Sequence, residues 1–183
     1  MRTHIIGYIA SALATGMLLT GCSEENPVTP RDDHDVVTTI TLSCVSTTGD
    51  TLSFTWQDDD AQGSAPPSRI DTIRLPAHAH FTGNVHVYNS TVNPVADITP
   101  SILADANHHQ FMFTDSRKLV EFSATDTDAN GKPIGLKYSL MTGENGSSTL
   151  RVSLYHYENA TDKVDNVPGS ESDISVEFPL LIE

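Results

Sequence analysis

Hydrophobic and polar residues alternate along most of the chain after residue 36. In the runs Ile40–Cys44 and Leu52–Trp56, every second residue is apolar. A period of two is typical of β-strands with one buried face. The pair Gly49-Asp50 lies between the two runs and supplies turn residues,. The pattern therefore predicts a β-hairpin.

The same pattern predicts further strands, and their inward residues are apolar. The predicted inward faces hold Ile73 and Leu75, Val85 and Val87, Leu150, Val152 and Leu154, and Ile174, Val176, Phe178 and Leu180. The further strands are Arg69–Leu75, Phe81–Asn89, Gln110–Phe113, Leu119–Thr125, Gly135–Met141, Thr149–Tyr157 and Asp173–Leu181.

One segment breaks this alternation. Residues 99–106 begin with Thr99, a residue suited to an N-cap, and Pro100, which suits the first helical position,. We expect one short helix there. About nine strands separated by turns predict an all-β fold, an antiparallel two-sheet sandwich that is immunoglobulin-like in general architecture. This domain is expected to cover residues 36–183.

The first residues follow a different pattern. A positive charge at Arg2 precedes the apolar run Ile5–Leu19, and polar sequence begins at Ser23. The run is ~15 residues long, short of the ~20 that a membrane-spanning helix needs. A basic start followed by a short apolar core predicts a secretory signal peptide over residues 1–21. Residues 22–35 are polar and contain two prolines, Pro27 and Pro30, which predicts a flexible tether,.

Leu19-Thr20-Gly21-Cys22 resembles the lipobox of bacterial lipoproteins. The resemblance implies that Cys22 is lipidated, becomes the first residue of the mature chain and anchors it to the membrane. Ser23-Glu24-Glu25 resembles the acidic signal of lipoproteins that are exported to the outer face of the outer membrane. The alternative is an ordinary cleaved signal with Cys22 as a chance thiol.

Charge restricts the partners of the mature chain. Without residues 1–21 it has 24 Asp+Glu against 9 Lys+Arg, a formal charge of −15, because the signal contains Arg2 and no acidic residue. Nucleic-acid binding needs a basic surface, so no nucleic-acid partner is expected. The negative charge also argues against electrostatic adhesion to anionic lipid. Cys44 shares the apolar face of Ile40 and Leu42, which predicts a buried thiol.

Two acidic segments are candidate calcium sites. Asp126, Asp128 and Asn130 match the opening D-x-[DN]-x-[DN]-G of a calcium loop, which brings oxygen ligands together in a tight turn,. Lys137 stands where an EF-hand needs Glu, so any calcium site here is of another type. The alternative is a hairpin loop whose turn is Asn130-Gly131.

The second acidic segment is Asp58, Asp59 and Asp60. Three adjacent carboxylates repel one another unless water or a cation surrounds them. This loop is therefore either solvated or a cation site, and it could share a site with residues 126–131 if both lie at one end of the sandwich.

The histidines are candidates for zinc or copper ligands. His78 and His80 lie two residues apart, on one face of an extended segment, whereas His108 and His109 would point to opposite sides of a strand. His156 continues the inward face of Leu150, which favours a histidine at the edge of the core over a metal ligand.

No hydrolase elbow, phosphate loop or metalloprotease helix occurs in the sequence,. Several phrases together resemble a group of small uncharacterised bacterial lipoproteins; they are Asp97-Ile98-Thr99, His109–Phe113, Asp126-x-Asp128, Leu154-Tyr155-His156 and Ser172–Phe178. This resemblance implies a lipoprotein with a β-domain and assigns no catalytic residue.

Three functions therefore stay open. The first is a non-enzymatic envelope module that binds a protein, a glycan or a small ligand, with or without calcium. The second is an exported metal-dependent hydrolase, and the third is a structural or assembly partner in the envelope. An enzyme requires at least three acidic or histidine side chains to converge in one place.

Overall fold

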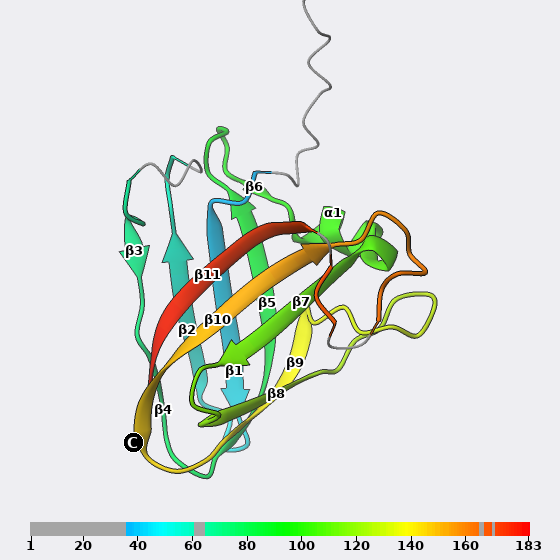
Figure 1. The fold of residues 1–183 in the computed structure, drawn as a ribbon. Helices are drawn as coiled ribbons and strands as arrows, with labels where there is room; N and C mark the ends of the chain where they lie inside the picture. The colour runs from blue at the N-terminus through cyan, green and yellow to red at the C-terminus, as the bar shows by residue number, and fades with distance from the viewer. Residues whose placement is uncertain (1–35, 61–64, 165–166, 170) are drawn as a thin grey trace, which may run out of the picture. The chain divides into compact units, whose positions relative to one another are not determined.

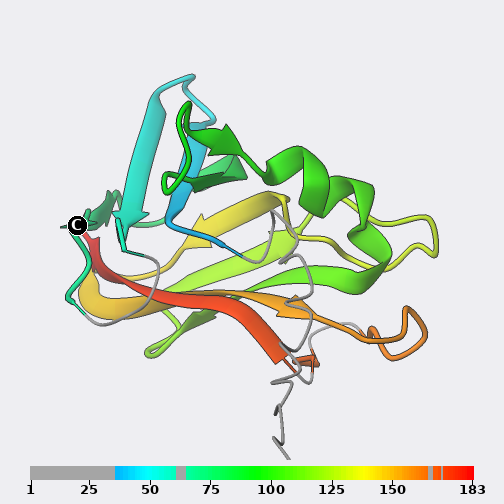
Figure 2. The same cartoon turned by 90° about the horizontal axis from the view of Figure 1, so that it is seen from above.

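The structure is a computed structural model that describes residues 36–60, 65–164, 167–169 and 171–183. These residues form two β-sheets packed as a sandwich, as the sequence predicts, and Figures 1 and 2 show the two layers. One sheet has the order β3 (Arg69–Ile70), β2 (Thr51–Gln57), β1 (Thr39–Ser46), β5 (His80–Asn89), β9 (Lys137–Thr142) and β8 (Val120–Ala124), with β6 (Ala96–Asp97) paired to β5. The other has the order β4 (Ile73–Leu75), β11 (Glu171–Ile182), β10 (Gly146–His156) and β7 (His109–Asp115).

The core lies between the sheets and consists of the alternating apolar residues. The predicted inward residues of β1, β4, β5 and β10 are all buried, and Cys44 is a free, buried thiol. Burial raises the pKa of Cys44 to about 11, so this thiol stays protonated. Leu52, Phe54 and Trp56 of β2 are half-buried and pack against the core from its side.

The segment predicted as a single strand, Arg69–Leu75, forms two strands in different sheets. β3 pairs with β2 in antiparallel fashion, whereas β4 pairs with β11 in parallel. Asp71 marks the break, because its Oδ2 accepts a hydrogen bond of 2.8 Å from the Thr55 N–H and its carboxylate also binds Arg69. The chain therefore crosses from one layer to the other at Asp71.

The short helix is present as α1 (Thr99–Ala104), followed by the 3-10 turn η2 (Ala106–His108). The predicted role of Thr99 as N-cap is wrong, because Ile98 occupies that position. The Thr99 hydroxyl instead accepts a hydrogen bond of 2.9 Å from the Val87 N–H of β5. This hydrogen bond therefore connects the start of α1 to β5.

Two glycines lie where a larger residue would be strained or would clash. Gly49 has φ of +94°, which suits the turn predicted between β1 and β2,. Gly83 of β5 lies under the ring of Tyr138, and a Cβ there would be 2.4 Å from the Ser43 carbonyl oxygen and from the ring. The Tyr138 hydroxyl donates a hydrogen bond of 3.1 Å to that same carbonyl.

Candidate metal centre

Two histidines meet where β7 begins and β10 ends. His109 is the first residue of β7 and pairs across the sheet with His156, the last residue of β10. Their rings stack with centroids 4.9 Å apart and an interplanar angle of 17°. The ring of His108 lies 6.2 Å from that of His156. The inward faces of these two strands therefore end in imidazoles.

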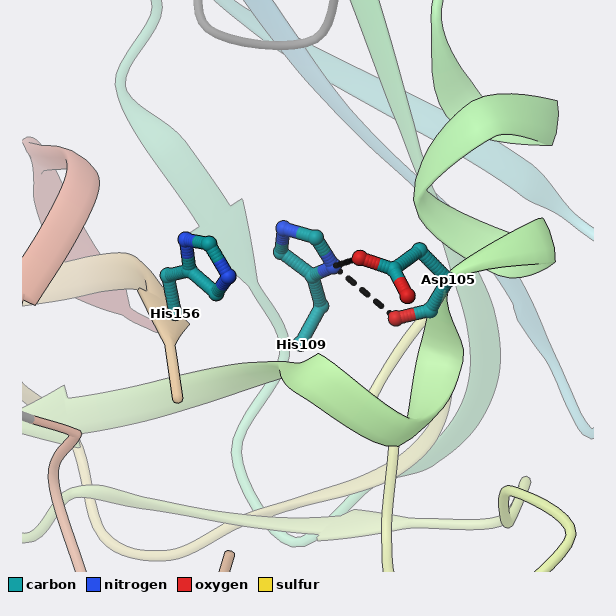
Figure 3. A group of neighbouring side chains, drawn as sticks. All are labelled: Asp105, His109 and His156. Atoms are coloured by element: carbon teal, nitrogen blue, oxygen red, sulfur yellow. Dashed lines mark hydrogen bonds and ion pairs between the residues drawn. The ribbon is translucent and has the colours of Figure 1, made fainter. Parts of the chain in front are cut away.

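Asp105 approaches His109 from the helical side, as Figure 3 shows. It is the C-cap of α1, and η2 then turns the chain into β7. The Nδ1 atom of His109 lies 3.0 Å from the carbonyl oxygen of Asp105 and 3.5 Å from its Oδ2. The His109 side chain is only 1% exposed, whereas that of Asp105 is 45% exposed. The Asp105 carboxylate thus lies at the surface, whereas the His109 ring is buried.

Asp173 faces the other ring nitrogen of His109. Its Oδ2 lies 3.4 Å from Nε2, and its side chain is 13% exposed. The register between β10 and β11 shifts here, since Leu154 pairs with Ile174 and Tyr155 pairs with Ser172. Asp173 is therefore the extra residue of a β-bulge, and bulges re-aim side chains.

The two carboxylates determine the charge of His109. Burial by itself lowers the pKa of this imidazole. The interaction with Asp173, the Asp105 carbonyl and the negative charges of both aspartates outweigh burial, so the pKa is raised above its ordinary value. The site thus favours the positively charged, protonated form of His109.

The same arrangement fits a metal ion. Asp105, His109 and His156 each offer one ligand atom, and these atoms lie within 4.8 Å of one another; no other such group occurs among the described residues. Two atoms bound at tetrahedral angles ~2.0–2.2 Å from zinc lie roughly 3.4 Å apart. The separation of 3.5 Å between Asp105 Oδ2 and His109 Nδ1 is close to that value. Imidazole and carboxylate together suit zinc and its neighbours better than calcium.

A buried ion pair supports the turn that carries Asp105 and His109. Lys163 Nζ donates to Asp128 Oδ2 at 3.0 Å and to the Ala106 carbonyl oxygen at 2.7 Å. Both charged side chains are almost fully buried, at 0% and 1% exposure. Asn130 adds a hydrogen bond of 3.2 Å to Asn107. In Figure 1 the loops after β8 and β10 accordingly gather beside η2.

The first predicted calcium segment thus has a structural role. Asp126 accepts hydrogen bonds from the backbone N–H groups of Gly135 and Lys137, at 2.9 and 3.0 Å. Asp128 accepts from Asn130 and Lys132 through Oδ1, in addition to Lys163 through Oδ2. The lysine neutralises the carboxylate that calcium would need. A calcium ion in this loop stays a prediction, and it would have to displace Lys163.

The second acidic segment lies elsewhere. Asp58 is buried, and its N–H donates a hydrogen bond of 2.8 Å to the Thr38 carbonyl oxygen. Asp59 accepts a hydrogen bond of 2.6 Å from the side-chain amide of Gln57. The Asp60 N–H lies 3.4 Å from Asp58 Oδ1. This loop follows β2, and the loop 126–131 follows β8. Three strands separate β2 from β8, which places them roughly 19 Å apart,. The two acidic segments therefore follow well-separated strands.

The histidines that the sequence places together are not the ones that meet. His78 has φ of +53° and lies before β5, with Nε2 3.6 Å from an oxygen of Glu144. His80 is exposed at the start of β5, so the predicted pairing of these two on an extended face is wrong. His109 and His156 meet instead, from segments 47 residues apart.

Two ligands were within reach of sequence reasoning. His156 continues the inward face of β10, and the pattern His109-Gln110-Phe111-Met112-Phe113 places His109 inward by the same alternation. Asp173 had no such signal, since regular alternation with Ile174 would turn it outward.

A cavity of about 500 Å³ begins one residue further along β7. It lies between β7 and β8 and the loop after β8, and its lining includes Gln110, Phe111, Phe122 and Asp126. The rings of Phe113 and Phe122 stack there at 4.4 Å. The cavity has the size of a ligand site, but Asp105, His109 and His156 do not line it,.

Comparison with known proteins found no matching family model, no matching curated protein and no matching solved structure. Cys22, the lipobox and the tether lie outside the described residues. Within the described part of the chain, no helix has the length and apolar character needed to cross a membrane.

Proposed function

We propose that the protein is a lipid-anchored envelope protein whose β-sandwich binds a divalent transition metal ion of the zinc class. The observation that carries the proposal is the convergence of Asp105, His109 and His156 within 4.8 Å. Two neutral imidazoles with one carboxylate form a ligand set typical of this class. The anchor is supported by the Leu19–Cys22 sequence, and the outer membrane, at its outer face, is the proposed location.

Zinc titration of the full chain tests this. We expect one zinc ion per chain in a calorimetric titration and a higher melting temperature than in EDTA. At a free concentration 100 times its dissociation constant, a ligand stabilises the folded state by ~2.7 kcal/mol. His156→Ala should abolish both effects, because it removes one ligand from a half-buried position.

His80→Ala is the matched control, since it removes an exposed imidazole outside the cluster. It should bind zinc as the wild type does. If His80→Ala abolished binding while His156→Ala did not, the metal would be held elsewhere and this proposal would be wrong. No zinc binding by the wild type would also contradict it.

Calcium at the acidic loops is a separate proposal, supported by the oxygen-rich sequence of Asp126–Gly131 and of Asp58–Asp60. Melting in excess calcium and in EDTA tests it. Because Lys163 already pairs with Asp128, a calcium effect should be larger for the Asp58–Asp60 loop than for residues 126–131. Substituting Asp59→Asn and Asn130→Ala separates the two loops.

A metal-dependent hydrolase is the second candidate function. Three protein ligands leave a fourth position for water, which is the arrangement of catalytic zinc sites. The cavity beside Gln110 and Phe111 offers space for a substrate. Hydrolysis of activated phosphate or carboxylate esters by the zinc-loaded wild type, lost in His156→Ala, would favour the enzyme over a binding module.

A further inference from the structure

His109 lies between two carboxylates, one at each ring nitrogen. Asp105 Oδ2 lies 3.5 Å from Nδ1, and Asp173 Oδ2 lies 3.4 Å from Nε2. A neutral imidazole carries one proton, so only one of its nitrogens can ligate a metal ion. Whichever nitrogen binds the metal, the opposite carboxylate is placed to accept the remaining N–H.

The group of converging ligand atoms takes its carboxylate from Asp105, together with His109 and His156. Asp105 contacts His109 at Nδ1 through Oδ2 at 3.5 Å and through its backbone carbonyl oxygen at 3.0 Å. In the metal-free chain this carbonyl accepts the Nδ1–H, and a metal ion held by Asp105 would take the place of that proton, which makes Nδ1 the nitrogen on the metal side. The Nε2 atom then carries the proton and points at Asp173. Histidine ligands commonly donate their second N–H to a carboxylate, which fixes the ring and its tautomer.

A bulge in β11 directs the Asp173 side chain toward His109. Ile174 and Ser172 pair with consecutive residues of β10, and Asp173 between them is the extra residue of the bulge. In a regular strand Asp173 would point away from the side occupied by Ile174. The bulge brings an acidic side chain that is 13% exposed against a histidine that is 1% exposed. Placing a carboxylate there is costly unless a polar group meets it.

We propose that Asp173 is the positioning residue of the metal centre: its carboxylate accepts the Nε2–H of His109 and so presents Nδ1 to a metal ion held with Asp105 and His156. This inference rests on the proposed metal binding. Asp105 and Asp173 together carry two negative charges, which match the charge of a divalent ion bound by neutral histidines. Asp173 touches the ligand and not the metal.

Asp173→Asn tests this role in the full chain, because the amide has nearly the same shape without the charge. An amide N–H group directed at Nε2 favours the Nδ1–H tautomer, which blocks Nδ1. We expect zinc affinity to fall about 10- to 100-fold, the usual effect of losing such a partner. Nitrogen-15 NMR of the His109 ring should show the metal on Nδ1 and the proton on Nε2 in the zinc-loaded wild type, whereas the variant should keep the Nδ1–H of the metal-free chain.

Glu177→Gln is the control, since it removes an exposed carboxylate from the same strand. It should change neither the affinity nor the tautomer. Asp173→Glu restores the charge and should recover part of the affinity lost in Asp173→Asn.

The outcomes distinguish this inference from the proposed function. Wild-type zinc binding that Asp173→Asn leaves within twofold, or a proton on His109 Nδ1 in the zinc-loaded wild type, would overturn the role of Asp173 alone. Failure of the wild type to bind zinc would overturn the proposed function. If Asp173→Asn melts far below the wild type, the tautomer of the zinc-loaded wild type still decides the question.

Discussion

Lys163 forms a buried ion pair with Asp128, with Nζ 3.0 Å from Oδ2, and joins the loop after β10 to the loop after β8. The same ammonium group donates to the carbonyl oxygen of Ala106 in η2. Three segments that are remote in sequence thus meet at one charge, next to the candidate ligands Asp105 and His109. The pair should matter for stability and for the geometry of the centre.

Lys163→Met should destabilise the protein strongly. The substitution leaves the Asp128 carboxylate buried without its cation, and breaking a buried pair in this way costs ~3–5 kcal/mol. Urea denaturation at neutral pH measures the loss. The control is Arg151→Ala, which breaks the exposed pair between Arg151 and Glu177 and should cost less than about 1 kcal/mol,. Equal effects of the two substitutions would contradict a special role for Lys163.

Acid should weaken the fold through Asp128. Burial raises the pKa of this carboxyl group, but hydrogen bonds from the Lys132 N–H, from Lys163 and from the Asn130 N–H outweigh burial and hold it below its ordinary value. The unfolded chain therefore binds the proton more readily than the folded chain. The contribution is present above the unfolded pKa of ~3.9 and is lost as pH falls through the lower folded pKa.

Urea midpoints from neutral pH to about pH 2 measure this loss. Asp128→Asn should be less stable than the wild type at neutral pH and should lose less stability on acidification. Some pH dependence should remain, because hydrogen bonds also hold the pKa of Asp115 below its ordinary value against the effect of burial. Parallel curves for the two proteins would show that Asp128 is not the group responsible.

Gly83→Ala should destabilise the sandwich by overpacking. The new Cβ would lie 2.4 Å from both the Ser43 carbonyl oxygen and the Tyr138 ring, so strand or ring must move. Such strain typically costs ~1–3 kcal/mol. Thermal melts compare it with Gly143→Ala, whose nearest neighbour would be 3.3 Å away. The prediction fails if both variants melt together.

Cys22→Ser should release the chain from the membrane. The proposed anchor is the lipid on this cysteine, and an acyl chain contributes ~0.8 kcal/mol per buried methylene group. Membrane fractionation and labelling with a fatty-acid analogue follow the change, with Cys44→Ala as the variant that keeps the label. Protease treatment of intact cells then distinguishes the outer from the inner face.

The alternation of apolar residues predicts most strands and the core, because a half-buried strand repeats its environment every two residues. The alternation does not predict the break at Asp71. The apolar pattern continues through Arg69–Leu75, which predicts one strand. The Asp71 carboxylate binds the Thr55 N–H, and the chain passes there from one sheet to the other. The prediction of Thr99 as a helix cap failed similarly, since its hydroxyl binds Val87 of another element.

The candidate metal centre was likewise predictable from the sequence only in part. His156 and His109 follow the alternation and could be placed inward from sequence. Asp173 reaches His109 through a bulge, a register shift that depends on the neighbouring strand. Lys163 lies in a loop, where no periodic pattern predicts burial. The sequence around its partner Asp128 resembles a calcium loop, and only the structure shows that Lys163 pairs with this carboxylate.

The crossing at Asp71 has a consequence for contacts between copies of the chain. Edge strands β3 and β4 belong to different sheets and are joined by two residues, and edge strands β7 and β8 are joined by the short turn after Asp115. Each outer strand is thus tied to an outer strand of the opposite layer. Exposed strand edges are templates for association between chains. β3 and β4 are only two and three residues long, so these two edges offer little backbone for another chain to pair with,.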